Sequence, residues 1–260
     1  MSTHPAGPPV FADMAASPSA WRHHGLRLLA LLALCFLALQ LAFAARIALM
    51  NVLDPQSTSF QRSEAWRLLV TQGRIAWRQE WVPNERLSAQ LKRAVIASED
   101  ATFADHSGVD WTAIEKAWER NQKAEARAEK RGLPPTKAKV VGGSTISQQL
   151  AKNLLLSGER TVLRKGQELV LTLMLEMLLS KQRMLEIYLN NVEWGEGVFG
   201  AQAAARHYFR VDASQLGAMQ AARLAVMLPA PKRFEKQPGS AYVIGRAGTI
   251  VARMPAVDLP

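Results

Sequence analysis

The chain has 260 residues, of which 48% are hydrophobic and 21% are charged, proportions that suit one globular domain with an appendage. The only cysteine, Cys35, excludes a fold held by disulfide bonds. The five histidines have no metal-ligand spacing, so we expect no zinc site. A formal net charge of +10 predicts a surface that attracts anions.

The appendage is predicted near the N-terminus. Residues 1–25 form a predicted cytoplasmic tail, which begins rich in Pro, Ala and Ser, and residues 26–50 a transmembrane signal anchor. Leu28 to Ala45 carries no charge, and as a helix it rises about 27 Å against a hydrocarbon core of roughly 30 Å. Arg22 and Arg27 precede this run, so the positive-inside rule predicts a cytoplasmic N-terminus and an exported remainder.

Two alternatives compete with the anchor. Ala42-Phe43-Ala44 is typical of a signal-peptide cleavage site, although the run is long for such a peptide. A buried core helix is the other alternative, although Gln40 is the only polar residue of the run.

Residues 51–84 are predicted to be a connector, followed by a mainly α-helical domain over residues 85–254. Apolar spacing predicts one helix from Pro83-Asn84-Glu85 to Ser98-Glu99-Asp100 and a second after Asp110. Further helices are expected over residues 145–156, 164–184, 185–190, 201–208 and 214–228, and no strand of useful length is apparent.

The exported part has 32 − 2 = 30 basic and 22 − 1 = 21 acidic residues, or +9, since Arg22, Arg27 and Asp13 are the only charges before residue 46. The expected anions are lipid headgroups or a phosphate-bearing lipid substrate. Residues 120–139 form a basic run that is either a solvated loop or a patch facing such anions. No nucleic-acid-binding motif is present, so we expect no nucleic acid partner.

Three places carry candidate chemistry. Glu99 and Asp100 adjoin at a helix C-terminus, where the dipole and the second carboxylate favour a raised pKa, as a general base requires. Glu168 lies among cations that favour its ionised form. The sequence GGSTISQQLAKN, from Gly142 to Asn153, predicts a helix start with free N–H groups, where a phosphate binds readily.

Five segments, in order, resemble the motifs of the peptidoglycan glycosyltransferase family, glycosyltransferase family 51. They are EDATFADHSGVD, GGSTISQQLAKN, RKGQE, KQRMLEIYLNNVEWG and AARLAVMLPAP, within residues 85–254. No Ser-x-x-Lys sequence is present to begin a transpeptidase domain, so a monofunctional enzyme is expected.

The resemblance implies a lysozyme-like helical glycosyltransferase domain, preceded by a single N-terminal transmembrane helix, on the periplasmic face of the plasma (inner) membrane. It implies that lipid II and undecaprenyl-pyrophosphate-linked glycan are the substrates, joined with inversion into linear strands as undecaprenyl pyrophosphate is released. Contact with cell-wall synthesis or division machinery is also expected.

The resemblance also implies roles for residues. Glu99 matches the catalytic base, and Glu168 a second catalytic glutamate that steadies phosphates or a divalent ion. The substrate-binding positions are Ser144, Gln148, Lys152, Asn153, Arg164, Lys165 and Arg246. Asp100, Phe103 and His106 are expected to brace the loop around Glu99 rather than touch sugar, and Glu186, Tyr188 and Asn190 to be scaffold. Gln220 departs from the glutamate common in the family's fifth motif.

No cofactor is required by the sequence, although a Mg or Mn ion at Glu168 is a possible addition. Two rival functions stay open: a lytic transglycosylase or lysozyme-type enzyme that cleaves glycan, and a non-catalytic, membrane-tethered cell-wall scaffold.

Overall fold

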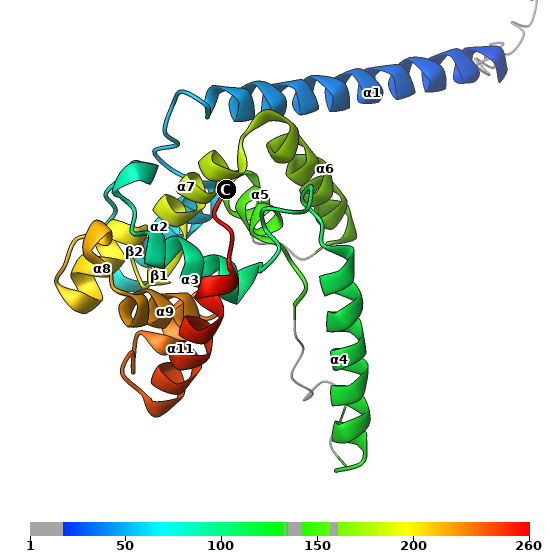
Figure 1. Cartoon of the computed structure of the whole chain (residues 1–260). Helices are drawn as coiled ribbons and strands as arrows, with labels where there is room; N and C mark the ends of the chain where they lie inside the picture. Colours follow the sequence, from blue (N-terminus) through cyan, green and yellow to red (C-terminus); the bar gives the residue numbers. More distant parts are fainter. Residues whose placement is uncertain (1–17, 133, 135–141, 157–160) are drawn as a thin grey trace, which may run out of the picture. The chain divides into compact units, whose positions relative to one another are not determined.

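The structure is a computed structural model that describes residues 18–132, 134, 142–156 and 161–260, and it is mainly helical as predicted (Figure 1). The chain divides into two compact units, residues 1–45 and residues 46–260.

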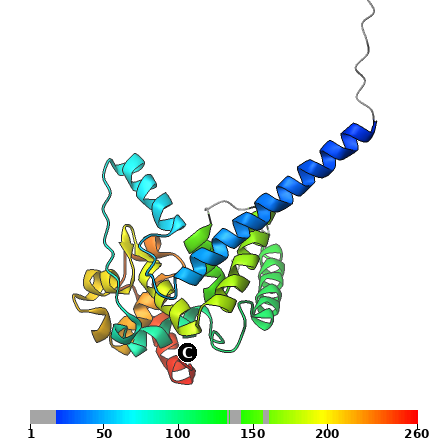
Figure 2. The same ribbon diagram turned by 90° about the horizontal axis from the view of Figure 1, so that it is seen from above.

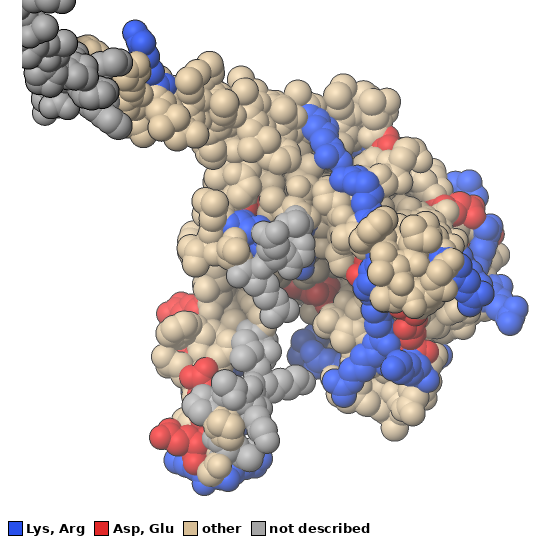
Figure 3. All heavy atoms as spheres, turned by 180° about the vertical axis from the view of Figure 1, so that it is seen from behind, with Lys and Arg blue, Asp and Glu red and all other residues tan. Residues whose placement is uncertain are grey.

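The first unit is dominated by α1 (Pro18–Leu49), which continues into the second unit. From His23 to Leu49 this helix is long and apolar enough to cross a membrane. Its large apolar side chains from Leu26 to Leu41 are exposed. Figure 3 shows that the surface of α1 is almost uncharged along its length, apart from basic side chains at its N-terminal end. Such exposure disagrees with a buried core helix and fits the predicted membrane anchor.

The predicted connector, residues 51–84, belongs to the compact unit of residues 46–260. It contains α2 (Ser59–Gln72), whose N-terminus is closed by reciprocal hydrogen bonds between Thr58 and Gln61. Gln61 and Leu68 are fully buried, and α2 packs against α5 (Ile146–Leu155). Segment 51–84 therefore helps to build the domain rather than merely leading to it.

The remaining elements follow the predicted helical order. A short 3₁₀ turn, η1 (Asn84–Arg86), precedes the others, which are α3 (Ala89–Glu99), α4 (Trp111–Glu129), α6 (Val162–Leu178), α7 (Lys181–Asn191), α8 (Ala201–Phe209), η3 (Ala213–Gln215), α9 (Ala218–Met227), α10 (Pro231–Phe234), α11 (Ala241–Arg253) and η4 (Met254–Ala256). The predicted basic run of residues 120–139 lies partly in α4 and partly outside the described residues.

The prediction of a single helix over residues 164–184 is wrong. α6 ends at Leu178, and Ser180 begins α7 by accepting a hydrogen bond from the N–H of Arg183. The uninterrupted apolar sequence hid this break, because apolar residues on both sides of it continue a helical pattern. The two helices differ in burial, since α7 is almost wholly buried while α6 keeps an exposed apolar side.

Two groups of helices build the core of the second unit. α9 packs against both α3 and α11, and α5 packs against α2, α6 and α7 (Figures 1 and 2). Fully buried leucines such as Leu91, Leu150 and Leu171 lie in these contacts, and each stabilises the fold by roughly 1.5–3 kcal/mol. Between α7 and α8, the strands β1 (Glu193–Gly195) and β2 (Val198–Phe199) form a small antiparallel hairpin.

Candidate active site

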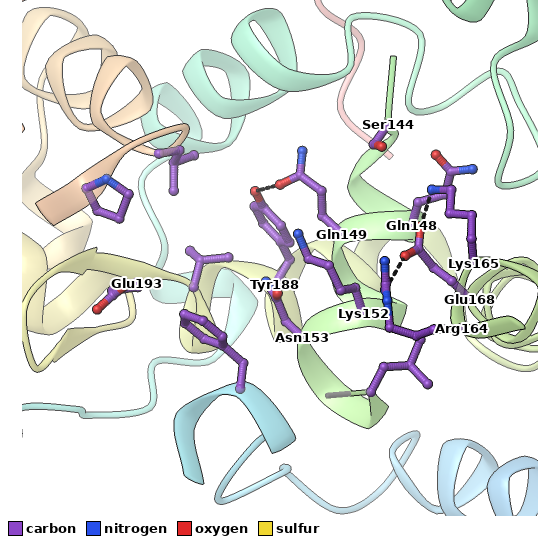
Figure 4. Close-up of a pocket in the computed structure, with 15 residues that line it drawn as sticks. Ser144, Gln148, Gln149, Lys152, Asn153, Arg164, Lys165, Glu168, Tyr188 and Glu193 are labelled. Carbon is purple, nitrogen blue, oxygen red and sulfur yellow. Dashed lines mark hydrogen bonds and ion pairs between the residues drawn. The ribbon is translucent and has the colours of Figure 1, made fainter. Parts of the chain in front are cut away.

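A cleft of about 500 Å³ opens beside α5 in the second unit. Its described walls come from α2, α5, α6, α7, β1 and the α9–α10 segment (Figure 4). The cleft is lined by seven of the predicted site residues, namely Ser144, Gln148, Lys152, Asn153, Arg164, Lys165 and Glu168. These seven belong to the second and third motifs, so residues of two separate motifs meet in one place.

The start of α5 shapes the middle of the cleft. Thr145, rather than Ser144, caps the helix, and the Gln148 side chain accepts a hydrogen bond from the N–H of Thr145 at 3.1 Å. The reciprocal bond, from the N–H of Gln148 to the Thr145 hydroxyl, fixes the first turn. Ser144 is left exposed at the cleft, and Lys152 lies one turn beyond Gln148 on the same face (Figure 4).

One end of the cleft, the cation end, is formed by Lys152, Arg164, Lys165 and Glu168. Glu168 is 3% exposed; its Oε2 accepts a hydrogen bond from Nη1 of Arg164 at 2.9 Å, and its Oε1 accepts one from Lys165. Thr161 caps α6 and so places Arg164, Lys165 and Glu168 in the first two turns of that helix. The carboxylate thereby holds two cations in fixed positions, where an anionic ligand can reach them.

Glu168 does not form a metal site by itself. Both of its oxygens are bonded to cations, and the described residues contain no cluster of three or more His, Cys, Asp or Glu side chains able to hold an ion. Divalent Mg or Mn requires several oxygen ligands. The described protein groups therefore do not fit a protein-held divalent ion.

Glu99, the predicted base, is the last residue of α3. Its Oε2 accepts a hydrogen bond from Nε2 of Gln149 at 3.0 Å, and the Tyr188 hydroxyl donates to Oε1 of Gln149 at 2.8 Å. Gln149 and Tyr188 line the cleft (Figure 4). Glu99 itself is not a lining residue, but its carboxyl is bonded to Gln149 and so adjoins the wall.

The protonation of Glu99 follows from these surroundings. Burial raises the pKa of the Glu99 carboxyl, and the nearby Asp100 raises it further, whereas hydrogen bonds from Gln149 and Ser98 lower it. The direction agrees with the sequence prediction. The main cause is different, because burial contributes more than the adjacent carboxylate.

The residues expected to brace this loop are buried together. Asp100 accepts the N–H of Ile146 at 2.9 Å, and its two carboxylate oxygens lie 2.9 and 3.0 Å from Nε2 of His106. Phe103 is fully buried beneath the ammonium of Lys181, which lies 4.6 Å from its ring centre. Asp100, the residue directly after Glu99, therefore links the end of α3 to the first turn of α5, where the helix dipole favours a negative charge.

Gly108 completes the loop. Its φ of +91° is unusual for other residues, and a Cβ atom there would lie 2.8 Å from Cγ2 of Thr172. Its carbonyl accepts a hydrogen bond from the Thr145 hydroxyl at 2.7 Å. The first motif is thus held against both α5 and α6.

Three further predicted positions lie elsewhere. Arg246 is exposed on α11 and does not line the described cleft, so its role stays a prediction. Asn190 is scaffold, since its amide bonds both backbone polar groups of Val82. Gln220 accepts a hydrogen bond from the N–H of Gly217 at 3.0 Å, a bond that a glutamate would also accept.

Sequence reasoning missed several residues of the cleft. Tyr188 was expected to be scaffold and Gln149 was not singled out, although both connect to Glu99. The adjacent pair Gln148-Gln149 indicated that Gln149 also has a partner, because neighbouring helical residues point about 100° apart and the two side chains reach different groups. The other unpredicted lining residues are Phe60, Leu156, Val192, Glu193, Leu228 and Pro231.

Comparisons with known proteins show the family of this chain. The family described as Transglycosylase matches residues 68–255. A biosynthetic peptidoglycan transglycosylase of Burkholderia pseudomallei (strain K96243) is 51% identical over 265 residues, covering 100% of this chain and 99% of its own. Relatives of the same name from Burkholderia thailandensis (53% identity; 86% of this chain and 83% of its own) and Paraburkholderia xenovorans (50%; 89% and 91%) are also similar. The chain therefore belongs to the family of peptidoglycan transglycosylases.

Proposed function

We propose that this peptidoglycan glycosyltransferase polymerises lipid II at the cleft beside α5, with Glu99 as the base and the cation end as the pyrophosphate site. One observation carries the proposal: α5 holds Glu99 through Gln149 and also contributes Lys152 to the cation end. A base and a leaving-group site are therefore positioned by a single helix.

The reaction transfers a growing glycan from its pyrophosphate carrier to a lipid II acceptor. The 4-hydroxyl oxygen of the acceptor sugar forms a bond to the anomeric carbon of the donor, and the bond from that carbon to the pyrophosphate oxygen breaks. Glu99 takes the hydroxyl proton, and the bonding electrons leave with undecaprenyl pyrophosphate. Attack from the face opposite the leaving group inverts the anomeric carbon. A buried glutamate with a raised pKa accepts a proton more readily than an ordinary one.

The cation end stabilises the negative charge that develops on the leaving pyrophosphate. Arg164 and Lys165 are already oriented by Glu168, so little reorganisation is needed when the charge appears. Lys152 on α5 and Ser144, just before the cap of α5, line the same cleft (Figure 4). A glycan hydrolase has no need for such a cation group, which favours synthesis over the lytic alternative.

The exposed apolar side of α6 supports contact with a membrane. Val162 and Leu163 are 91% and 86% exposed, and Met177 is 76% exposed farther along the helix. α1 supplies an apolar helix compatible with a single-pass anchor. We place the catalytic domain on the periplasmic face of the inner membrane, with the N-terminus in the cytoplasm; partners in cell-wall synthesis or division stay a prediction.

No protein-bound cofactor enters this mechanism. If a divalent ion takes part, the substrate phosphates must supply most of its ligands, since Glu168 is already engaged. Polymerisation measured in EDTA and then with added Mg or Mn tests this dependence.

The test of the function is incubation of the purified full-length protein with lipid II in detergent. Glycan polymer and released undecaprenyl pyrophosphate are measured beside a Glu99→Gln control, which keeps the shape of the side chain but removes the base. We expect polymer from the wild type alone.

The other outcomes of this incubation distinguish the scaffold from the lytic enzyme. Intact lipid II after incubation with folded wild-type protein would favour the scaffold, and shortening of pre-made glycan would favour the lytic enzyme. Polymer from Glu99→Gln would assign the base elsewhere.

A further inference from the structure

The cleft has a second end, whose residues have no role in the mechanism above. It is formed by Phe60 on α2, Val192 and Glu193 at β1, Leu228 after α9, and Pro231 at the start of α10. Figure 4 shows Glu193 apart from Arg164, Lys165 and Glu168, with Tyr188 between them. We name these five residues the acid end.

The carboxyl of Glu193 is the polar group of the acid end. Glu193 is 9% exposed. Its Oε1 is shielded from solvent and accepts no hydrogen bond among the described residues, so a ligand in the cleft would meet the carboxyl at Oε2. Nζ of Lys232 lies 3.4 Å from Oε1 of Glu193, but the same ammonium donates to Oε2 of Glu64 at only 2.5 Å. Glu193 is therefore a buried acid whose hydrogen-bonding capacity is incompletely used, and such groups need a partner.

Lys232 belongs to a chain of ion pairs that holds this wall in place. Arg67 on α2 donates to Glu64 at 2.8 Å and to Glu196 at 2.6 Å, so Glu64 is shared between Arg67 and Lys232. The chain joins α2, α10 and the β1–β2 turn. Glu193 is its terminal member and the one that lines the cleft.

The protonation of Glu193 is balanced near neutral pH. Burial is the main cause that raises the pKa of its carboxyl, Lys232 and Arg67 lower the pKa, Glu64 raises it, and the resulting pKa is about 7. Tyr208 on α8 and Glu235 after α10 are the other titratable groups close by. At neutral pH the carboxyl therefore exists both with and without its proton, able to donate or to accept a hydrogen bond.

The surroundings select the chemistry of the occupant. A pyrophosphate would meet a carboxylate here rather than the cations at the opposite end, and an apolar prenyl chain would leave the buried carboxyl with only the shared ammonium of Lys232. An uncharged ligand with amide and hydroxyl groups satisfies the carboxyl. Its apolar ring face would pack on Phe60, Leu228 and Pro231, as in pockets where apolar walls surround a few polar groups.

We propose that the acid end binds an N-acetylated sugar of the substrate, with Glu193 hydrogen-bonded to an amide or hydroxyl group of that sugar. This proposal rests on the proposed function and adds a residue that recognises the glycan separately from the pyrophosphate. Glu193 contributes to binding rather than to proton transfer, so it should act on KM more than on kcat.

The test compares Glu193→Leu and Glu193→Gln in full-length protein, with lipid II polymerisation followed between pH 6 and pH 8.5. Loss of the hydrogen bond in Glu193→Leu should raise KM about tenfold with little change in kcat. Glu193→Gln keeps hydrogen-bonding groups, so its KM should stay within about threefold of wild type. The wild-type KM should also vary with pH near neutrality more than the KM of Glu193→Gln does.

Glu196→Gln is the matched control, because it alters the far end of the ion-pair chain without altering the cleft lining. Its KM should equal that of wild type. An unchanged KM in Glu193→Leu would overturn the proposal. The proposal would also fail if Glu193→Leu and Glu196→Gln showed the same rise in KM and the same fall in melting temperature, because Glu193 would then have a structural role. An inactive wild type would instead refute the proposed function itself.

Discussion

Glu99 is the last residue of α3 and Glu168 lies in the second turn of α6, and the surroundings of the two carboxyl groups are opposite. Glu168 is bonded to Arg164 and Lys165, whereas the hydrogen bonds to Glu99 come from the uncharged side chains of Gln149 and Ser98. The first arrangement keeps a carboxylate charged in order to hold cations, and the second leaves a carboxyl with a raised pKa in order to take a proton. Glu168 in the cleft and Glu99 beside its wall are thus given different tasks by their neighbours.

Removing a cation tests the Glu168 side of this comparison and should have the largest effect. We expect Lys152→Ala to lower kcat by about 10²–10³-fold, the usual loss when one preorganised partner of a developing charge is removed. Lipid II polymerisation measures it, and Lys152→Arg, which keeps the charge, is the control. Near-normal turnover of Lys152→Ala would separate this lysine from the leaving group.

Changing Gln149, which donates a hydrogen bond to Glu99, tests the Glu99 side of the comparison. Glu99 must be deprotonated to act as a base, so activity should rise with pH through its raised pKa. Gln149→Met removes a hydrogen bond that lowers this pKa, and the acidic limb of the pH–rate profile should therefore move to higher pH.

At the same pH on the acidic limb, Gln149→Met should therefore be slower than wild type. Activity should recover at alkaline pH, where Glu99 is deprotonated in both proteins. A uniform loss at every pH would show that Gln149 contacts substrate or supports the fold instead of tuning Glu99.

The brace behind Glu99 should have a smaller effect, on stability more than on chemistry. Asp100→Asn removes the charged acceptor of the Ile146 N–H and the charged partner of His106. We expect the free energy of unfolding to fall by about 1–3 kcal/mol, as measured by urea denaturation. Unchanged stability together with lost turnover would assign Asp100 to the reaction.

Local signals predicted much of this site from the sequence. The end of α3 at Glu99 and the capped start of α5 were predicted, because each depends on residues within one turn. The same holds for the pairing of Arg164 with Glu168, four residues apart on one helix. The start of α3 was placed too early, since residues 84–86 form a 3₁₀ turn and Ser88 begins the α-helix.

The rest depended on contacts between distant segments. Tyr188 reaches Gln149 across 39 positions of sequence, and Lys232 reaches Glu64 across 168. No periodicity or spacing reports such pairs, because tertiary packing decides them. The acid end was missed for this reason, since its members come from four elements and only Glu193 carries an obvious chemical group.

The division of labour between the two glutamates is tested most directly by lipid II binding to Glu99→Gln and Glu168→Gln, measured side by side with full-length protein in detergent. Glu99→Gln should bind within about threefold of wild type while polymerising nothing, because only proton transfer is lost. Glu168→Gln should bind at least about tenfold more weakly, because Arg164 and Lys165 lose the charge that orients them. Weakened binding by Glu99→Gln together with wild-type binding by Glu168→Gln would contradict the account.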